Sequence, residues 1–299
     1  MTEQYVKANG VRLAYDEFGN PSQPAIVLIM GLGTQMIAWP EEFCHGLAAE
    51  GYRVVRFDNR DIGLSEKMDA AKMPSLLKMM LLARLKLPFK VPYKLHDMAE
   101  DTVGLLDALD IDAAHLVGAS MGGMIAQLVA SNYPYRTLSL TSIMSTSGCS
   151  SLPRPGRNVT AHMGKRPPSG EQDFLDSAMR TWRLIGSPDY QPSDEVLREK
   201  IRRSYQRSYH PLGFARQLAA IVASGDRVEV LKKIQAPSLV IHGKSDVLVP
   251  VEGGIDTARH IPDAKLELID GMGHDLPQPL LARFVDLIAS HAAGAVAST

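Results

Sequence analysis

The 299-residue sequence predicts an α/β fold in which helices flank a mostly parallel sheet and a further group of helices is inserted late in the chain. Short apolar runs bounded by turn residues alternate with helical periodicity up to residue 144, and the alternation resumes at residue 236. Residues 146–226 lack that alternation and contain three successive helical patterns. We therefore expect a core formed by 1–145 and 227–299, with 146–226 as a helical cap.

The individual elements follow from the same patterns. Residues 25–30 are apolar throughout, which is typical of a strand buried on both faces. Gly51 directly follows a helical pattern and is a typical residue to end it. The expected strands are 11–18, 25–30, 52–57, 114–119, 137–144, 238–242 and 265–269. The expected helices are 37–50, 95–109, 120–133, 171–185, 193–207, 213–224, 252–260 and 278–291.

Composition excludes several classes of protein. A hydrophobic fraction of 45% with 22% charged residues is ordinary for a globular chain and excludes wholesale disorder, collagen and coiled coil. The net charge of −1 argues against a nucleic-acid-binding protein. Cys44 and Cys149 are too few for a disulfide framework, so we expect reduced, packed thiols and no zinc site. Because no signal-peptide pattern or long apolar stretch is present, we expect a cytoplasmic location without stable membrane association.

The motif Gly118-Ala119-Ser120-Met121-Gly122 lies between an expected strand and an expected helix. In this context G-x-S-x-G forms a sharp turn that projects the serine hydroxyl above the sheet, and the glycines avoid a collision with the turn. Ser120 is therefore the candidate nucleophile. A glycine-rich turn without chemistry is the alternative, although neither common nucleotide-binding glycine pattern fits.

A serine nucleophile needs a base and a group that orients the base, in the chain order serine, acid, histidine. His274 follows the last expected strand, and Asp246 follows the strand at 238–242. The carboxyl ends of parallel strands are where such sheets place their sites, so we predict Asp246 and His274 as the partners of Ser120. Asp226 and Asp270 are the alternatives for the acid, but one ends the insertion and the other lies close to His274 in sequence.

Backbone N–H groups are expected to bind the oxyanion of a tetrahedral intermediate. Met121 N–H lies at the start of the helix that follows the serine. The second donor should come from the loop Gly31-Leu32-Gly33 after the strand at 25–30, where glycines allow close approach, and we predict Leu32 N–H. A simple tight turn is the alternative for this loop.

With these motifs in this order, residues 5–145 and 227–290 resemble the α/β-hydrolase family. The segment 58–65 is similar to the family's D-x-R-x-x-G-x-S turn, which is structural in most members. The resemblance implies that the cap follows the family's sixth strand. Met30 stands where many members have a histidine, so that histidine's hydrogen bond is absent. Segments around Trp39 and His274 are similar to aclacinomycin methylesterases and related carboxylesterases, a subgroup of the family whose substrate is not carried over to this chain.

The resemblance and the candidate residues together predict a serine carboxylesterase that acts through an acyl-enzyme on a small-molecule ester with an apolar acyl or alcohol group. No metal or organic cofactor is expected. Serine at position 120 disfavours the family's dehalogenases and epoxide hydrolases, which need a carboxylate nucleophile. A lactonase and a cofactor-free perhydrolase would use the same three residues, and a non-catalytic binding protein on the same scaffold is the alternative from another class.

The charges are unevenly distributed along the chain. Residues 72–94 carry six Lys and Arg and no acid, and 147–225 carry twelve Lys and Arg against seven Asp and Glu. The remaining residues carry 14 basic and 26 acidic side chains, which predicts an acidic core with basic segments over its entrance. We interpret 72–94 as a helix packed beside the cap, and an interfacial lid helix is the alternative.

Overall fold

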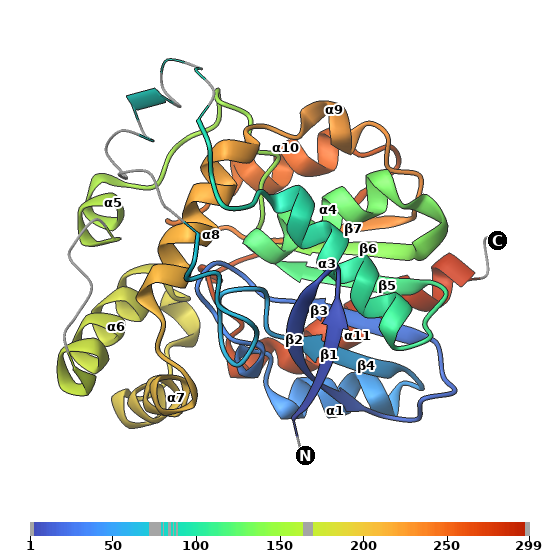
Figure 1. Ribbon diagram of the computed structural model, residues 1–299, viewed down its shortest axis with the longest axis horizontal. Coiled ribbons are helices and arrows are strands. Elements are labelled where there is room, and N and C mark those ends of the chain that lie inside the picture. The colour runs from blue at the N-terminus through green and yellow to red at the C-terminus, as the bar shows by residue number, and fades with distance from the viewer. Residues whose placement is uncertain are drawn as a thin grey trace.

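The computed structural model describes residues 3–71, 79, 81, 82, 85, 87, 89–163 and 170–296. Its centre is an eight-stranded sheet with the order β1-β2-β4-β3-β5-β6-β7-β8 (Figure 1). β2 pairs antiparallel with β1 and β4, and the other pairs are parallel, which confirms the predicted fold class. The strands are β1 (Gln4–Ala8), β2 (Val11–Phe18), β3 (Ala25–Ile29), β4 (Arg53–Phe57), β5 (Ala114–Ala119), β6 (Thr137–Ile143), β7 (Ser238–Gly243) and β8 (Lys265–Ile269).

Helices cover both faces of the sheet (Figure 1). In β3, Ile26 and Leu28 pack in one apolar cluster with α1 and α11, and Val27 and Ile29 pack in the other with α3 and α4. Successive side chains of a strand point to opposite faces, so a central strand between two helical layers is apolar on both. These helices are α1 (Glu41–Ala49), α3 (Leu95–Ala108), α4 (Met121–Asn132) and α11 (Leu281–Val296); α10 (Glu252–His260) packs on β7 and β8.

Two elements differ from those expected. The sequence patterns missed β1 because its side chains are mostly exposed at the sheet edge, where no apolar run is needed. The helix expected at 37–50 is interrupted at Pro40, with a 3₁₀ turn at Met36–Ala38 before it and α1 after it. Proline lacks an N–H and has a fixed φ, so it precedes a helix readily but does not continue one.

The helical insertion (146–226) lies between β6 and β7. Its helices are α5 (Arg157–Met163), α6 (Glu171–Ile185), α7 (Asp194–Arg207) and α8 (Pro211–Ser224), of which α5 was not expected. The two ends of the insertion lie together, since Arg227 N–H donates to Ser147 O (2.8 Å) and the Arg227 guanidinium donates to Thr146 O (2.7 Å). α6 and α7 form a hairpin, and in Figure 1 α8 lies between this hairpin and the sheet.

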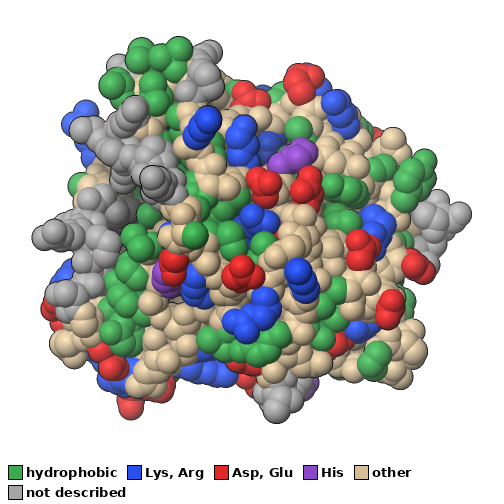
Figure 2. Space-filling model, viewed as in Figure 1, with side chains coloured by type: hydrophobic (Ala, Val, Ile, Leu, Met, Phe, Trp, Pro, Cys, Tyr) green, Lys and Arg blue, Asp and Glu red, His purple; other side chains and the backbone are tan. Residues whose placement is uncertain are grey.

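The viewed face of the molecule carries Lys and Arg side chains interspersed with Asp and Glu rather than a field of one sign (Figure 2). The expected helix over 72–94 lies largely outside the described residues. Tyr93, near its end, is buried, and its hydroxyl donates to Asp61 Oδ2 (2.6 Å). Six basic residues of the insertion form ion pairs within the described part of the chain.

Two further expectations concern membranes and thiols. No helix in the described part of the chain is both long and apolar enough to cross a bilayer. Both cysteines are free thiols. Cys44 is buried in the core as expected, and burial raises the pKa of its thiol to about 12. Cys149 is only half-buried, so the prediction that both thiols are packed in the core is correct for Cys44 alone.

Candidate active site

Ser120 occupies a sharp turn between β5 and α4. Its φ of +56° is unusual for a residue with a Cβ, and its N–H donates to Ile143 O (2.9 Å). A Cβ on Gly118 would lie 2.2 Å from Gly122 O, and a Cβ on Gly122 would lie 2.0 Å from Ile29 O. The two glycines therefore let the turn pack against the sheet, which is the role that the sequence motif predicts for them.

Ser120, His274 and Asp246 form a continuous series of hydrogen bonds. His274 Nε2 lies 3.0 Å from Ser120 Oγ, and His274 Nδ1 lies 2.7 Å from Asp246 Oδ2. The two alternative acids lie elsewhere: Asp226 accepts from the N–H of Val228, and the exposed Asp270 pairs with a lysine. The structure thus brings together the three side chains chosen from sequence.

The Asp246 carboxylate is buried and well supplied with donors. Its Oδ1 accepts from the N–H groups of Leu248 (2.9 Å) and Val249 (2.8 Å). The buried His242, four residues earlier on β7, places Nε2 3.5 Å from Asp246 Oδ2 and 2.8 Å from Val249 O. Burial raises the pKa of Asp246, but the adjacent His274 and the hydrogen bonds to the carboxylate more than offset this and lower it to about 2. Asp246 therefore carries its charge at neutral pH, where it fixes the orientation of His274. No sequence pattern predicted that His242 would lie beside the Asp246 carboxylate.

Two backbone N–H groups belong to residues that follow directly on Ser120 and on Gly31, the glycine beside it. A Cβ on Gly31 would lie 3.5 Å from Ser120 Oγ, so the loop 30–34, the oxyanion loop, passes directly beside the hydroxyl. Neither Leu32 N–H nor Met121 N–H donates a hydrogen bond to any residue that the structure describes. Met121 is also the first residue of α4, where N–H groups carry partial positive charge. Both groups are available to an oxyanion at Ser120.

The oxyanion loop is held from two sides. Asn59, from the turn after β4, donates from Nδ2 to Met30 O (2.8 Å). On the other side, Gly33 N–H donates to Gln217 Oε1 of α8 (2.8 Å), and Gln217 Nε2 donates to Arg60 O (2.9 Å). Gln217 is fully buried, and both its amide oxygen and its amide nitrogen are hydrogen-bonded to the protein. A helix of the insertion thus fixes the loop that carries Leu32 N–H, a contact that sequence analysis did not find.

A family model with the description alpha/beta hydrolase fold matches residues 24–277. The chain belongs to the α/β-hydrolase family. Rhodomycin D methylesterase DauP of Streptomyces sp. (strain C5) is 27% identical to it over 311 residues, which cover 97% of this chain and 98% of that protein. The match therefore extends through 146–226, where sequence analysis found no clear similarity.

Other relatives are named for a different activity. 3-Oxoadipate enol-lactonase 1 of Acinetobacter baylyi is 27% identical over 261 residues, covering 87% of this chain and 86% of that protein. The solved enol-lactonase of Burkholderia xenovorans has a TM-score of 0.75 at 21% identity, and the match covers 97% of this chain and all of that one. At this identity the similarity to the solved enol-lactonase shows a shared fold alone.

In this α/β-hydrolase the turn after β4 is the attachment point for α8. Arg216 donates from Nε to Asp61 Oδ2 (2.8 Å) and from NH2 to Asp61 Oδ1 (2.7 Å), and both side chains are buried. A Cβ on Gly213 would lie 2.2 Å from Asp61 O, so glycine allows the helix to approach the turn. Three residues earlier in the same turn, Asp58 is also fully buried and pairs with Arg207 of α7 (2.7 Å). The turn at 58–65 is thus structural, as the family resemblance implies, and it holds the insertion.

The chain after α6 contacts the loop that carries His274. Ile185 O accepts from His274 N–H (2.7 Å), and Ser187 Oγ accepts from Gly273 N–H (2.9 Å). Ser187 also donates to Asp275 Oδ1 through both its N–H (3.0 Å) and its hydroxyl. The insertion therefore supports the histidine loop as well as the oxyanion loop.

A cavity of about 1430 Å³ lies between the α6–α7 hairpin and the core. Gly33 and Thr34 of the oxyanion loop form part of its wall, and Asp275, directly after His274, forms another part. Ser120 and His274 themselves are not in the wall, so the cavity adjoins the hydrogen-bonded residues rather than containing them. Within the described residues, no group of three or more His, Cys, Asp or Glu side chains is arranged to hold a metal ion.

Proposed function

We propose that this protein hydrolyses carboxylic esters through an acyl-enzyme on Ser120. The observation that carries the proposal is the series of hydrogen bonds from Ser120 through His274 to the buried Asp246, beside two free backbone N–H groups. The half-buried serine is open to a substrate. A binding protein would have no need of a buried carboxylate that orients an imidazole, so the alternative without catalysis is disfavoured.

Each residue has one step in the proposed reaction. His274 Nε2 accepts the hydroxyl proton of Ser120 as Oγ attacks the ester carbonyl, and Asp246 stabilises the resulting imidazolium. The N–H groups of Leu32 and Met121 donate to the oxyanion, each contributing about 3–4 kcal/mol to the transition state. His274 then protonates the leaving alcohol, and the neutral imidazole activates a water that hydrolyses the acyl-enzyme.

The relatives support this reaction class and favour one second candidate. DauP is named as a methylesterase, and a methyl ester is an open-chain ester. The enol-lactonase of similar identity gives a reason to test cyclic esters as well. Hydrolysis of a lactone needs the same nucleophile, base and oxyanion donors, so the two activities differ only in how the substrate fits.

The insertion is proposed to act as a cap that shapes the substrate site, because it borders the cavity and supports both loops beside Ser120. A small-molecule ester is the proposed substrate. The cytoplasmic location stays a prediction, which fractionation of cells that express the protein tests.

The proposal is tested by hydrolysis of p-nitrophenyl butyrate and of a γ-lactone by wild type and two serine variants. Ser120→Ala should lower kcat by at least about 10⁴-fold on any ester the wild type cleaves. The exposed Ser151→Ala is the matched control and should keep the wild-type rate. Turnover by Ser120→Ala at the wild-type rate would contradict the proposal, and the ratio of ester to lactone turnover separates the two candidates.

A further inference from the structure

Helix α7 contributes four basic residues to the wall of the cavity, and three of them have carboxylate partners. Arg198 pairs with Asp176 (3.4 Å), and Arg203 pairs with Glu41 (3.0 Å). The third pairs with two acids: Arg202 NH1 lies 3.0 Å from Glu199 and its Nε lies 3.7 Å from Glu171. These arginines are already neutralised by neighbouring protein charges.

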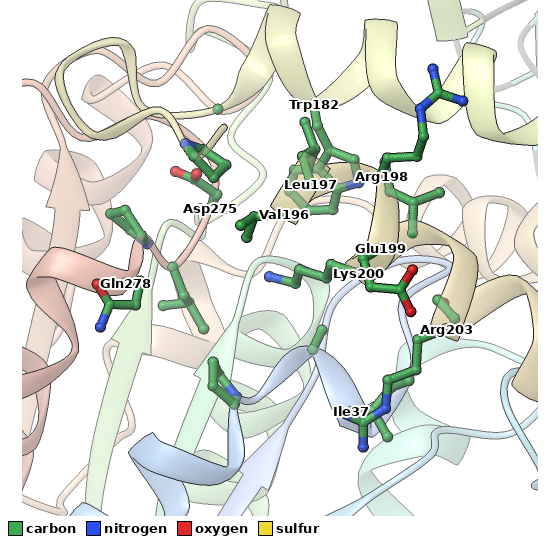
Figure 3. Close-up of a pocket in the computed structure, with 18 of the residues that line it drawn as sticks. Ile37, Trp182, Val196, Leu197, Arg198, Glu199, Lys200, Arg203, Asp275 and Gln278 are labelled. Carbon is green, nitrogen blue, oxygen red and sulfur yellow. The ribbon is translucent and has the colours of Figure 1, made fainter. Parts of the chain in front are cut away.

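Lys200 is the exception among these four. No carboxylate in the described part of the chain lies within 4.0 Å of its Nζ. Figure 3 shows its amine extending from α7 into the cavity, while Arg198 and Arg203 point to other sides. Lys200 is exposed, so its amine is open to a molecule that enters the cavity, and Asp275 is the carboxylate that acts on its charge. The cavity therefore contains a cation whose charge lacks a close partner.

Asp275 and Trp182 interact with the Lys200 amine, but neither forms a close ion pair with it. Asp275 Oδ1 accepts two hydrogen bonds from Ser187, which hold that carboxylate against the chain after α6. The ring of Trp182 lies 5.9 Å from Lys200 Nζ, at the outer limit of a cation–π contact. Trp182 and Phe174 both line the cavity, so an aromatic wall stands beside the free amine.

We propose that Lys200 is a specificity residue that binds an anionic oxygen, a carboxylate or phenolate, on an aromatic ester substrate whose ester group lies at Ser120. The inference rests on the proposed ester hydrolysis. The cavity adjoins the proposed catalytic residues, since Gly33 directly follows Leu32, Asp275 directly follows His274, and both line the cavity wall. The aromatic body would lie along Trp182, and the ammonium would form an ion pair that a neutral ester lacks.

Two esters with the same aromatic skeleton, one anionic and one neutral, test whether the charge of the substrate matters to Lys200. Monomethyl naphthalene-2,6-dicarboxylate carries a carboxylate opposite its ester, and the dimethyl diester is its neutral counterpart. In Lys200→Met, which keeps an unbranched side chain but lacks the terminal ammonium, kcat/KM for the half-ester should fall about tenfold, the equivalent of about 1.4 kcal/mol. For the diester it should stay within about twofold. The exposed Lys233→Met removes one positive charge away from the cavity and should change neither value.

The outcomes separate this inference from the proposed function. If Lys200→Met leaves the preference between the two esters as in wild type, or lowers both equally, the inference is wrong while ester hydrolysis stands. If wild type cleaves neither ester, hydrolysis of p-nitrophenyl butyrate shows whether the proposed function fails as well as the inference. Turnover of that ester that depends on Ser120 leaves the proposed function standing and removes the aromatic acidic ester as substrate. Equal unfolding temperatures for both lysine variants and wild type show that a loss of activity does not come from unfolding.

Discussion

Helix α8 and the α6–α7 hairpin belong to the same insertion, but they are joined to the core differently. The charged and amide side chains of α8 reach into the core, where Arg216 pairs with Asp61 and Gln217 bonds the oxyanion loop. The hairpin has a small apolar cluster of its own, and several of its ion pairs are internal, such as that of Arg183 with Asp194. Its polar contacts with the core are concentrated at residues 185–190 and 203–208.

This difference suggests that α8 and the hairpin have different roles within the insertion. α8 forms part of the catalytic framework, because removing its contacts would free a loop beside Ser120. The hairpin spans the cavity between its two attached ends, so its inner face is available to meet a substrate. Substitutions in α8 should therefore affect stability and kcat, and substitutions on the hairpin should affect the choice of substrate.

The largest expected effect is on the buried ion pair of α8. Arg216→Met leaves the Asp61 carboxylate buried without its bidentate partner, and we expect a loss of about 3–5 kcal/mol in the free energy of unfolding. Arg183→Met on the hairpin breaks an ion pair whose acid is 79% exposed, and the expected loss is below about 1 kcal/mol. Urea unfolding of both variants measures the contrast, and equal losses would show that the two attachments do not differ.

The next effect concerns the oxyanion loop. Gln217→Met removes the acceptor of Gly33 N–H, so Leu32 N–H should be less well positioned. We expect kcat to fall about 10–100-fold with little change in KM, somewhat less than the loss of an oxyanion donor itself. Gln278→Met, at an exposed position in the cavity wall, is the control and should keep kcat. A rise in KM at constant kcat in Gln217→Met would assign this residue to substrate binding instead.

The smallest effect is a pH dependence of the α8 attachment. Burial raises the pKa of Asp61, but Arg216, the Tyr93 hydroxyl and a backbone N–H outweigh it, so the folded-state pKa lies below that of the unfolded chain. A depressed carboxylate pKa stabilises the fold above the unfolded pKa of about 3.9, and the stabilisation is lost as pH falls through the folded pKa. In Arg216→Met the burial of Asp61 is no longer offset by the arginine, so the stability difference between wild type and this variant should be larger at pH 7 than at pH 3. A difference that does not narrow would remove Asp61 as its cause.

The comparison also shows what could be predicted from the sequence. Ser120 lies in a local strand–turn–helix motif, and His274 and Asp246 follow strands whose ends must meet, so topology alone predicts their proximity. The partners of Gln217 lie 157 and 184 residues away, and no local pattern predicts such contacts. The adjacent pair Arg216-Gln217 in an otherwise apolar helix is the one signal that could have indicated buried polar contacts.

Lys200 illustrates a second limit of sequence patterns. Basic residues recur along α7, and the sequence alone gives no reason to separate Lys200 from Arg198, Arg202 or Arg203. Which of them has a carboxylate partner depends on acids of α6 and α1, so only the packed structure distinguishes them. Of the basic residues of the insertion, Arg203, Arg207 and Arg216 pair with acids of the core. Arg183, Arg198 and Arg202 pair with acids of the hairpin.

The most direct measurement of the central claim is covalent labelling of the nucleophile. A fluorophosphonate should react once per molecule, and peptide mass spectrometry should place the adduct on Ser120, with none formed in Ser120→Ala. An adduct on another residue, or no adduct under conditions where the protein hydrolyses esters, would contradict an acyl-enzyme on Ser120.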